Sequence, residues 1–191
     1  AVDRRHRHQH IRTANVESNG DAISSRIPLF FNSDVVISKA HVKDSMKSLY
    51  RNGNADEVIF IHTGTGLFKS NFGNMELKPG DYLLIPRGII WQMDVKQPIR
   101  ILVIESSAPI ETPTRYRNKF GQLLEHSPYA ERDIRTPEFV GPVADTRMEV
   151  EVKLQHGIQT YGYQHHPFDI VGWDGYYFPY IFNINDFMPI T

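Results

Sequence analysis

Short apolar runs, separated by glycine and proline turns, constrain the fold of this chain more than any other feature. Asn52-Gly53-Asn54, Thr63-Gly64-Thr65-Gly66 and Lys78-Pro79-Gly80-Asp81 are turn signals. The runs between such turns recur about every ten residues, and none has the period of a long helix. Strands are predicted at residues 35–42, 58–61, 67–72, 82–85, 89–93 and 99–104. This pattern predicts an all-β protein, either an antiparallel sandwich or a barrel.

Composition and charge exclude several classes of protein. With 191 residues and a formal net charge of −1, the chain suits one domain, or one domain with extensions, and carries no basic cluster for nucleic acid. No apolar run approaches the roughly 18 residues of a membrane span. The chain has no cysteine, which excludes disulfides and thiolate metal sites and fits a cytoplasmic location.

Three regions of different character follow one another along the chain. Residues 1–33 are predicted to be a polar N-terminal extension and residues 34–106 a barrel core. Residues 107–191 are predicted to be a proline-rich connector, with one short helix near residues 120–125 and another strand at residues 147–154. The chain begins at Ala1 and ends after an apolar stretch, and from this we expect a fragment of a longer polypeptide.

Aromatic residues are concentrated at residues 161–187. So dense a set of large apolar side chains is not expected to stay in water. We therefore expect this segment to pack on the barrel, on another domain or on another subunit.

The spacing of glycine, proline and glutamate resembles the two motifs of the cupin family. Glu57 is followed after six residues by Gly64, and Gly80, Pro86 and Gly88 match the fixed points of the second motif. The expected histidines are missing from this chain. Residues 50–53 read Tyr-Arg-Asn-Gly, and the last histidine position holds Trp91.

These substitutions change what the barrel can bind. An indole nitrogen only donates hydrogen bonds, so Trp91 cannot replace a histidine as a metal ligand. Glu57 alone would not hold a transition metal. The sequence thus predicts a cupin barrel that binds no metal, joined to an irregular, aromatic-rich connector.

Longer segments resemble a particular cupin family, the homogentisate 1,2-dioxygenases. The similarity rests on Tyr-Arg-Asn-Gly-Asn-Ala-Asp-Glu at residues 50–57 and Gly-Asp-Tyr-Leu-Leu-Ile-Pro-Arg-Gly at residues 80–88. It continues in His-His-Pro-Phe-Asp-Ile-Val-Gly-Trp-Asp-Gly at residues 165–175, with Tyr180 and Asn183 after it.

The resemblance implies a protein with two cupin barrels, of which only the second binds Fe(II), through two His and one Glu. It implies opening of the homogentisate ring with O₂ to give maleylacetoacetate, and trimers that pair into hexamers. In this family the iron ligands lie beyond the segment that residues 166–183 match. No catalytic or metal-binding residue is therefore assigned to this chain, and its substrate-binding residues stay unassigned. Its expected partners are a second cupin domain, further copies of itself, a small aromatic acid and O₂, with no nucleic acid and no membrane.

Two groups of histidines are alternative metal sites. His6, His8 and His10 would share one face of a strand, but Arg4, Arg5 and Arg7 would repel a cation. His165 and His166 are adjacent, so on a strand they would point to opposite faces. For this pair we expect one buried, hydrogen-bonded ring and one that points outward. Asp169 is either a general base or, as we favour, an acceptor for backbone amides.

Three functions are compatible with these patterns. The chain could be the scaffold half of an iron dioxygenase that lacks the iron ligands. It could instead be a stand-alone cupin that binds a ligand or assembles with partners without catalysis. A third alternative is a metal-dependent enzyme that uses the N-terminal histidines.

Overall fold

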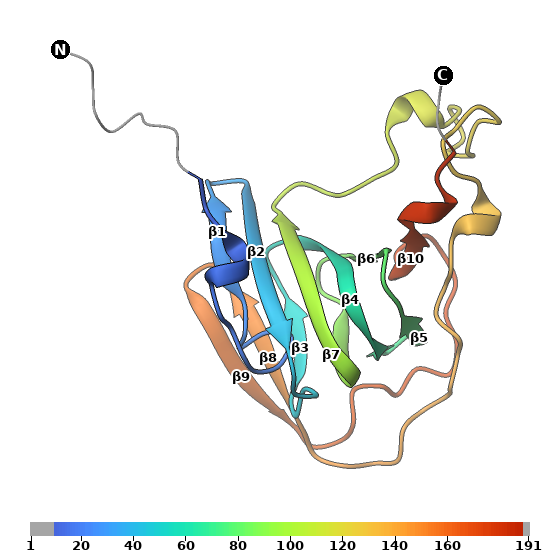
Figure 1. Ribbon diagram of the computed structural model, residues 1–191. Coiled ribbons are helices and arrows are strands. Elements are labelled where there is room, and N and C mark those ends of the chain that lie inside the picture. The colour runs from blue at the N-terminus through green and yellow to red at the C-terminus, as the bar shows by residue number, and fades with distance from the viewer. Residues whose placement is uncertain (1–9, 189–191) are drawn as a thin grey trace.

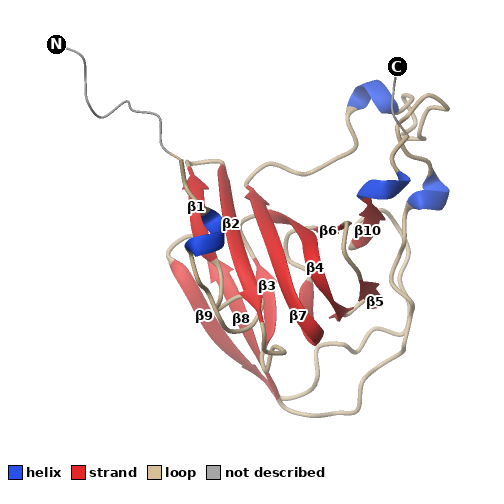
Figure 2. Cartoon of the chain, viewed as in Figure 1, coloured by secondary structure: helices blue, strands red, loops and turns tan. Residues whose placement is uncertain are grey.

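The computed structural model describes residues 10–188 and shows one highly curved β-sheet with only short 3-10 turns beside it (Figures 1 and 2). Two long strands, β4 (Asp56–Ser70) and β7 (Ile90–Ser106), form its centre and pair antiparallel along most of their length. Among the described residues, no helix is long and apolar enough to cross a membrane.

The other strands pair on either side of these two and extend the curved sheet. The continuous path through the sheet is β10-β6-β4-β7-β3-β8-β9, with β2 and β1 added beside β7 and β5 beside β4. The added strands are β1 (Ile27–Phe31), β2 (Val35–Val42), β3 (Leu49–Asn52), β5 (Gly73–Leu77), β6 (Asp81–Ile85), β8 (Met148–Leu154), β9 (Gly157–Tyr163) and β10 (Tyr180–Asn183). The prediction of an all-β fold with mostly antiparallel strands is confirmed, although β4 and β7 are longer than predicted. β3 and β8 are an exception, because they pair in parallel.

Two predicted strand boundaries lie inside continuous strands, which corrects the sequence-based assignment. Thr63 to Gly66 does not end a strand, because β4 continues through it with register shifts between Ile61 and Gly66. Gly64 has a φ of +87°, and a Cβ there would lie 2.2 Å from the carbonyl oxygen of Pro98. The glycines at this point therefore allow a long strand to bend while it stays paired. Residues 89–93 and 99–104 likewise belong to a single strand, β7.

The core lies inside the barrel and follows the two-residue alternation of the strands. Ile59 and Ile61 of β4 face Val103 and Ile101 of β7, and all four side chains are almost completely buried. Met93, Leu83, Ile85, Leu77 and Phe68 belong to the same cluster. Glu57 lies two residues before Ile59, and Glu105 lies two residues after Val103. The alternation therefore directs these two carboxylates inward as well.

The N-terminal region is more ordered than a polar extension. Strand β1 lies within residues 1–33 and pairs antiparallel with β2, from Ile27 opposite Lys39 to Phe31 opposite Val36. Ala22, just before it, is fully buried and belongs to the barrel core. The described part of this region therefore contributes both a strand and core contacts.

The connector crosses one end of the barrel and returns along its side to β8 (Figure 1). The short helix predicted near residues 120–125 is wrong. Asn118 accepts hydrogen bonds from the amides of Phe120 and Gln122, and this side-chain turn takes the place of a helix. Short 3-10 turns occur instead at η2 (Thr114–Tyr116) and η3 (Glu131–Asp133). The predicted strand at residues 147–154 is confirmed as β8, which pairs with β3 and β9.

Part of the aromatic C-terminal segment packs on the outer face of the barrel. Phe182 of β10 stacks on Tyr82 of β6 at 5.2 Å between ring centroids, and Tyr82 contacts Phe60 of β4 at 4.7 Å. Tyr129 of the connector and Phe187 extend this group of rings. The expectation that these aromatics need a packing partner is thus met in part by the barrel itself.

Candidate functional site

The interior position at which a cupin would hold its metal is filled by aromatic rings. Trp91 of β7 is fully buried and pairs across the sheet with Tyr50 of β3, which is 1% exposed. The rings of Trp91 and Tyr50 meet edge to face at 5.4 Å, and Phe68 lies 5.7 Å away on β4. The indole is therefore part of the hydrophobic core.

Glu57 also points into the barrel, and its carboxylate is held by an arginine. Arg26, which precedes β1, places Nη1 2.5 Å from Glu57 Oε1, and Asn52 Nδ2 donates to the same oxygen at 3.3 Å. The side chains of Arg26 and Glu57 are only 9% and 1% exposed. The Glu57 carboxylate is thus bound in a buried ion pair with strong hydrogen bonds.

A second carboxylate, which sequence reasoning missed, completes a buried ion cluster. Glu105 of β7 lies directly opposite Glu57 of β4, an arrangement that is unfavourable without a cation between them. Arg26 Nη1 donates to Glu105 Oε1 at 3.0 Å, and Lys153 of β8 forms an ion pair with the other Glu105 oxygen. Asn52 Nδ2 also donates to Glu105, at 3.3 Å. One signal could have revealed Glu105: it continues the alternating series of apolar, inward-facing residues Ile99, Ile101 and Val103.

The pKa shifts within the cluster reflect two opposing effects, burial and the charges of neighbouring side chains. Burial alone would lower the pKa of Arg26, but Glu57 and Glu105 outweigh it and raise that pKa above its ordinary value. Burial raises the pKa of Glu105, but Arg26 and Lys153 more than offset it, so the net shift is downward. Burial, followed by the charge of Glu57, raises the pKa of Tyr50, whose ring lies under the Arg26 guanidinium at 5.5 Å. These shifts favour the charged forms of Arg26 and Glu105 and the neutral form of the Tyr50 phenol at neutral pH.

These residues do not fit a metal ion. The site holds a permanent cation, Arg26, beside both carboxylates, and a metal ion would have to displace it. Trp91 offers no lone pair from its indole nitrogen. Within residues 10–188, no three His, Asp or Glu side chains come together as a metal site. At this site, Arg26 Nη2, Glu57 Oε2 and Trp91 Nε1 are buried and have no hydrogen-bond partner among the described residues.

Among the described residues, the other candidates from the sequence, which are His10, His165, His166 and Asp169, make no contact with this cluster. His6 and His8 fall outside the described residues, and His10 is exposed. His165 is exposed, and its Nε2 lies 3.7 Å from Asp169 Oδ2. His166 is half-buried and accepts a hydrogen bond from the amide of Phe168, and burial lowers its pKa. His165 and His166 therefore have different environments, although neither ring is fully buried.

The other acidic and aromatic residues have structural contacts. The favoured role of Asp169 is wrong, because its carboxylate is 57% exposed and contacts His165 rather than a backbone amide. Asp56 points to the opposite face of β4 from Glu57 and accepts hydrogen bonds from the amides of Arg87 and Ile110. Trp173 donates from its indole nitrogen to the carbonyl of Phe72, which joins the aromatic segment to the β4–β5 turn.

The strand order and the inward-facing residues together define the class of protein. The chain is an all-β cupin barrel in which aromatic rings and a buried ion cluster occupy the interior. A cupin protein from Bacteroides fragilis aligns with 49% of this chain and 86% of its own length, with a TM-score of 0.40 and 22% identity.

Sequence comparison identifies the family within this class. Residues 22–184 match the family described as homogentisate 1,2-dioxygenase N-terminal, and the chain belongs to that family. A protein of Saccharolobus solfataricus named "Putative dioxygenase" is 38% identical over 99% of this chain and 49% of its own length.

Two homogentisate 1,2-dioxygenases are more distant relatives. Those of Nitrobacter hamburgensis and Caenorhabditis elegans are each 30% identical, over 72% and 73% of this chain and 30% and 31% of their own lengths. The chain thus spans about half the length of the Saccharolobus protein, and its match spans about a third of each homogentisate dioxygenase. The family resemblance drawn from the sequence motifs is confirmed.

Proposed function

We propose that this chain is the scaffold barrel of an iron-dependent, ring-cleaving dioxygenase and that its own interior binds no metal. One observation carries the proposal: Trp91 packs against Tyr50 at the histidine position, while Arg26 neutralises the neighbouring Glu57. A site with this much aromatic surface and a fixed cation favours packing over metal binding. The family relationship supports an Fe(II)- and O₂-dependent opening of homogentisate to maleylacetoacetate by the whole protein.

The exposed apolar residues support a role in assembly. Tyr176 is completely exposed, Val171 is 84% exposed, and Phe120 is 76% exposed. We propose that these residues contact a second cupin barrel of the same polypeptide or a neighbouring copy in a trimer or hexamer. Such surfaces are characteristic of interfaces. The absence of cysteine from the sequence is consistent with a cytoplasmic enzyme.

The proposal is tested by measuring iron and activity in the intact protein. The protein is loaded with Fe(II) without oxygen, and its iron content and its O₂ uptake with homogentisate are measured. We expect Trp91→Phe to keep the iron content of the parent protein, because the ring would still fill the core. Trp173→Phe is the matched control outside the barrel. Loss of iron in folded Trp91→Phe, with the control unchanged, would contradict the proposal.

A stand-alone, non-catalytic cupin is the second candidate, and the filled interior favours it equally. The two candidates differ in the mass of the native polypeptide. A further segment that supplies two His and one Glu supports the dioxygenase. A native polypeptide without such a segment, which takes up neither iron nor O₂, supports the module. Stoichiometric iron bound through the N-terminal histidines would support the third alternative instead.

A further inference from the structure

A groove on the outside of the barrel is lined by an excess of positive charge. It has a volume of about 570 Å³ and lies between residues 13–19 and the outer face of β2, β4 and β7. This volume is within the range of small-molecule sites. The groove, called here the outer groove, is separated by the sheet itself from the interior cluster of Glu57 and Trp91.

Hydrogen bonds hold the N-terminal segment over the sheet and so form the roof of the groove. Lys39 Nζ donates to the carbonyl oxygens of Thr13 and Val16. Ser18 Oγ accepts from the amide of His41, and Gly20 accepts from the amide of Lys43 at 2.9 Å. The roof therefore lies along the C-terminal end of β2, with which β1 does not pair.

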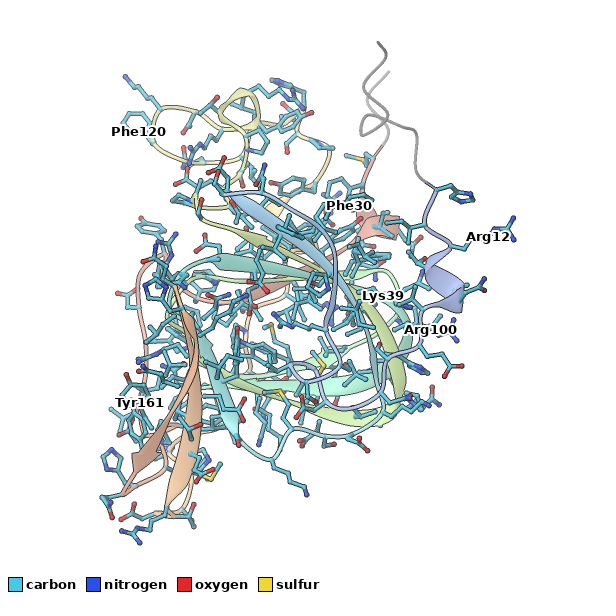
Figure 3. All side chains as sticks on the ribbon, turned by 90° about the vertical axis from the view of Figure 1, so that its left-hand side faces the viewer. Arg12, Phe30, Lys39, Arg100, Phe120 and Tyr161 are labelled. Atoms are coloured by element: carbon cyan, nitrogen blue, oxygen red, sulfur yellow. The ribbon has the colours of Figure 1, made fainter. Side chains whose placement is uncertain are left out.

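Strand pairing brings the cationic side chains of the groove together. His41 of β2 lies directly opposite Arg100 of β7, and Arg100 is also paired with Thr63 of β4, next to His62. Lys39 of β2 lies two residues before His41, and Lys43, just after the end of β2, lies two residues after it. In Figure 3, Lys39 and Arg100 lie next to each other beneath the N-terminal segment that carries Arg12. Among the described residues that line the groove, Glu17 is the one acidic residue.

These charges are largely unbalanced within the described part of the chain. The side chains of Lys43, His62 and Arg100 make no ion pair or hydrogen bond with residues 10–188, unlike Lys69 and Lys96, which each pair with a carboxylate. Burial lowers the pKa of His41, and Lys43, Arg100 and Lys39 lower it further. His41 therefore experiences a net positive field, which an anion in the groove would relieve.

Apolar side chains form the next row of the same surface. Leu102 of β7 lies between Lys39 of β2 and Phe60 of β4, and all three line the groove. Leu29 of β1 adds to this row, which neighbours the row of His41 and Arg100. A ligand could therefore place an anionic group against Arg100 and His41 and an apolar body against Phe60 and Leu102.

We propose that the outer groove binds a small organic anion, a carboxylate or a phosphate monoester carried on an apolar body. Arg100 is its main contact, because a guanidinium binds the oxygens of either group in a bidentate manner. This site is independent of the proposed function, since it lies on the opposite face of the sheet from the barrel interior.

The test measures binding of defined probes to the intact protein by NMR and calorimetry. The probes are benzoate, phenyl phosphate, inorganic phosphate and the neutral benzamide. We expect benzoate or phenyl phosphate to bind saturably, and benzamide and inorganic phosphate to bind at least about fivefold more weakly. Tighter binding of benzoate would indicate a carboxylate ligand, and tighter binding of phenyl phosphate would indicate a phosphate ligand.

Two charge-matched variants locate the site. Arg100→Met removes the charge in the groove, and Arg115→Met removes an exposed arginine of the connector. We expect Arg100→Met to weaken the binding of the preferred probe by roughly fivefold or more and Arg115→Met to leave it unchanged. Equal affinity in the parent and Arg100→Met, no saturable binding of benzoate or phenyl phosphate, or inorganic phosphate as strong as phenyl phosphate would each overturn the proposal.

Discussion

Replacing Arg26 by methionine would leave two opposed carboxylates in the barrel without the cation that joins them. Arg26, Glu57 and Glu105 have side chains that are only 9%, 1% and 5% exposed, so water cannot solvate the uncompensated charge well. Removing one partner of a buried pair costs about 3–5 kcal/mol. We expect a loss near the lower value, about 3 kcal/mol, because Lys153 and Asn52 still contact Glu105.

Urea unfolding at pH 7, followed by circular dichroism and tryptophan fluorescence, measures this loss. Single domains are stable by about 5–15 kcal/mol, so Arg26→Met should remain folded at 25 °C and unfold at a lower urea concentration. Arg115→Met, at an exposed position, should change the free energy of unfolding by less than about 0.5 kcal/mol.

A second substitution separates charge from packing. Adding Glu57→Gln to Arg26→Met removes the unpaired carboxylate and keeps its shape, so we expect about half of the lost free energy to return. The reasoning would be refuted if Arg26→Met cost less than about 1 kcal/mol or if the double variant were no more stable than the single one.

Two further predictions concern β10 and the response to acid. Asn183 is 4% exposed and donates to Asp81 at 2.8 Å and to the carbonyl of Pro79 at 3.1 Å, so Asn183→Ala should cost about 1–3 kcal/mol and speed amide hydrogen exchange in β10. Unchanged exchange there would contradict this role. Although burial raises the pKa of Glu105, Arg26 and Lys153 outweigh it and hold the folded-state pKa below 4.5. The ionised Glu105 therefore stabilises the folded state fully above pH 4.5. This stabilisation is lost as the pH falls through the folded-state pKa of Glu105. The free energy of unfolding, measured from pH 7 to pH 3, should therefore fall less steeply in Glu105→Gln than in the parent protein, and identical slopes would exclude this role.

Strand boundaries illustrate where local sequence signals fail. The sequence around Thr63–Gly66 reads as a turn, because glycine permits turns and bulges equally. The structure resolves the ambiguity, since the pairing of β4 with β7 continues on both sides of Gly64. The helix predicted near residues 120–125 fails for a related reason. There the Asn118 side chain satisfies the amides that a helix would otherwise have used.

The sequence by itself determined the fold class and the identity of the residue at the last histidine position of the second cupin motif. Turn residues and strand alternation act over a few neighbours, and Trp91 is found at that position by its fixed spacing from Gly80, Pro86 and Gly88. These features depend on local chemistry, which a single sequence carries directly.

Only the tertiary structure decided how the remaining interior charge is neutralised and where an outer groove forms. Arg26, Glu57, Glu105 and Lys153 come from four separate segments. The pairing of β4, β7, β3 and β8 brings Glu57, Glu105 and Lys153 together, and the pairing of β1 with β2 and of β2 with β7 adds Arg26, which precedes β1. His41 and Arg100 become neighbours in the same way, through the pairing of β2 with β7. Such contacts depend on strand register over long sequence separations, which residue type and local spacing do not specify.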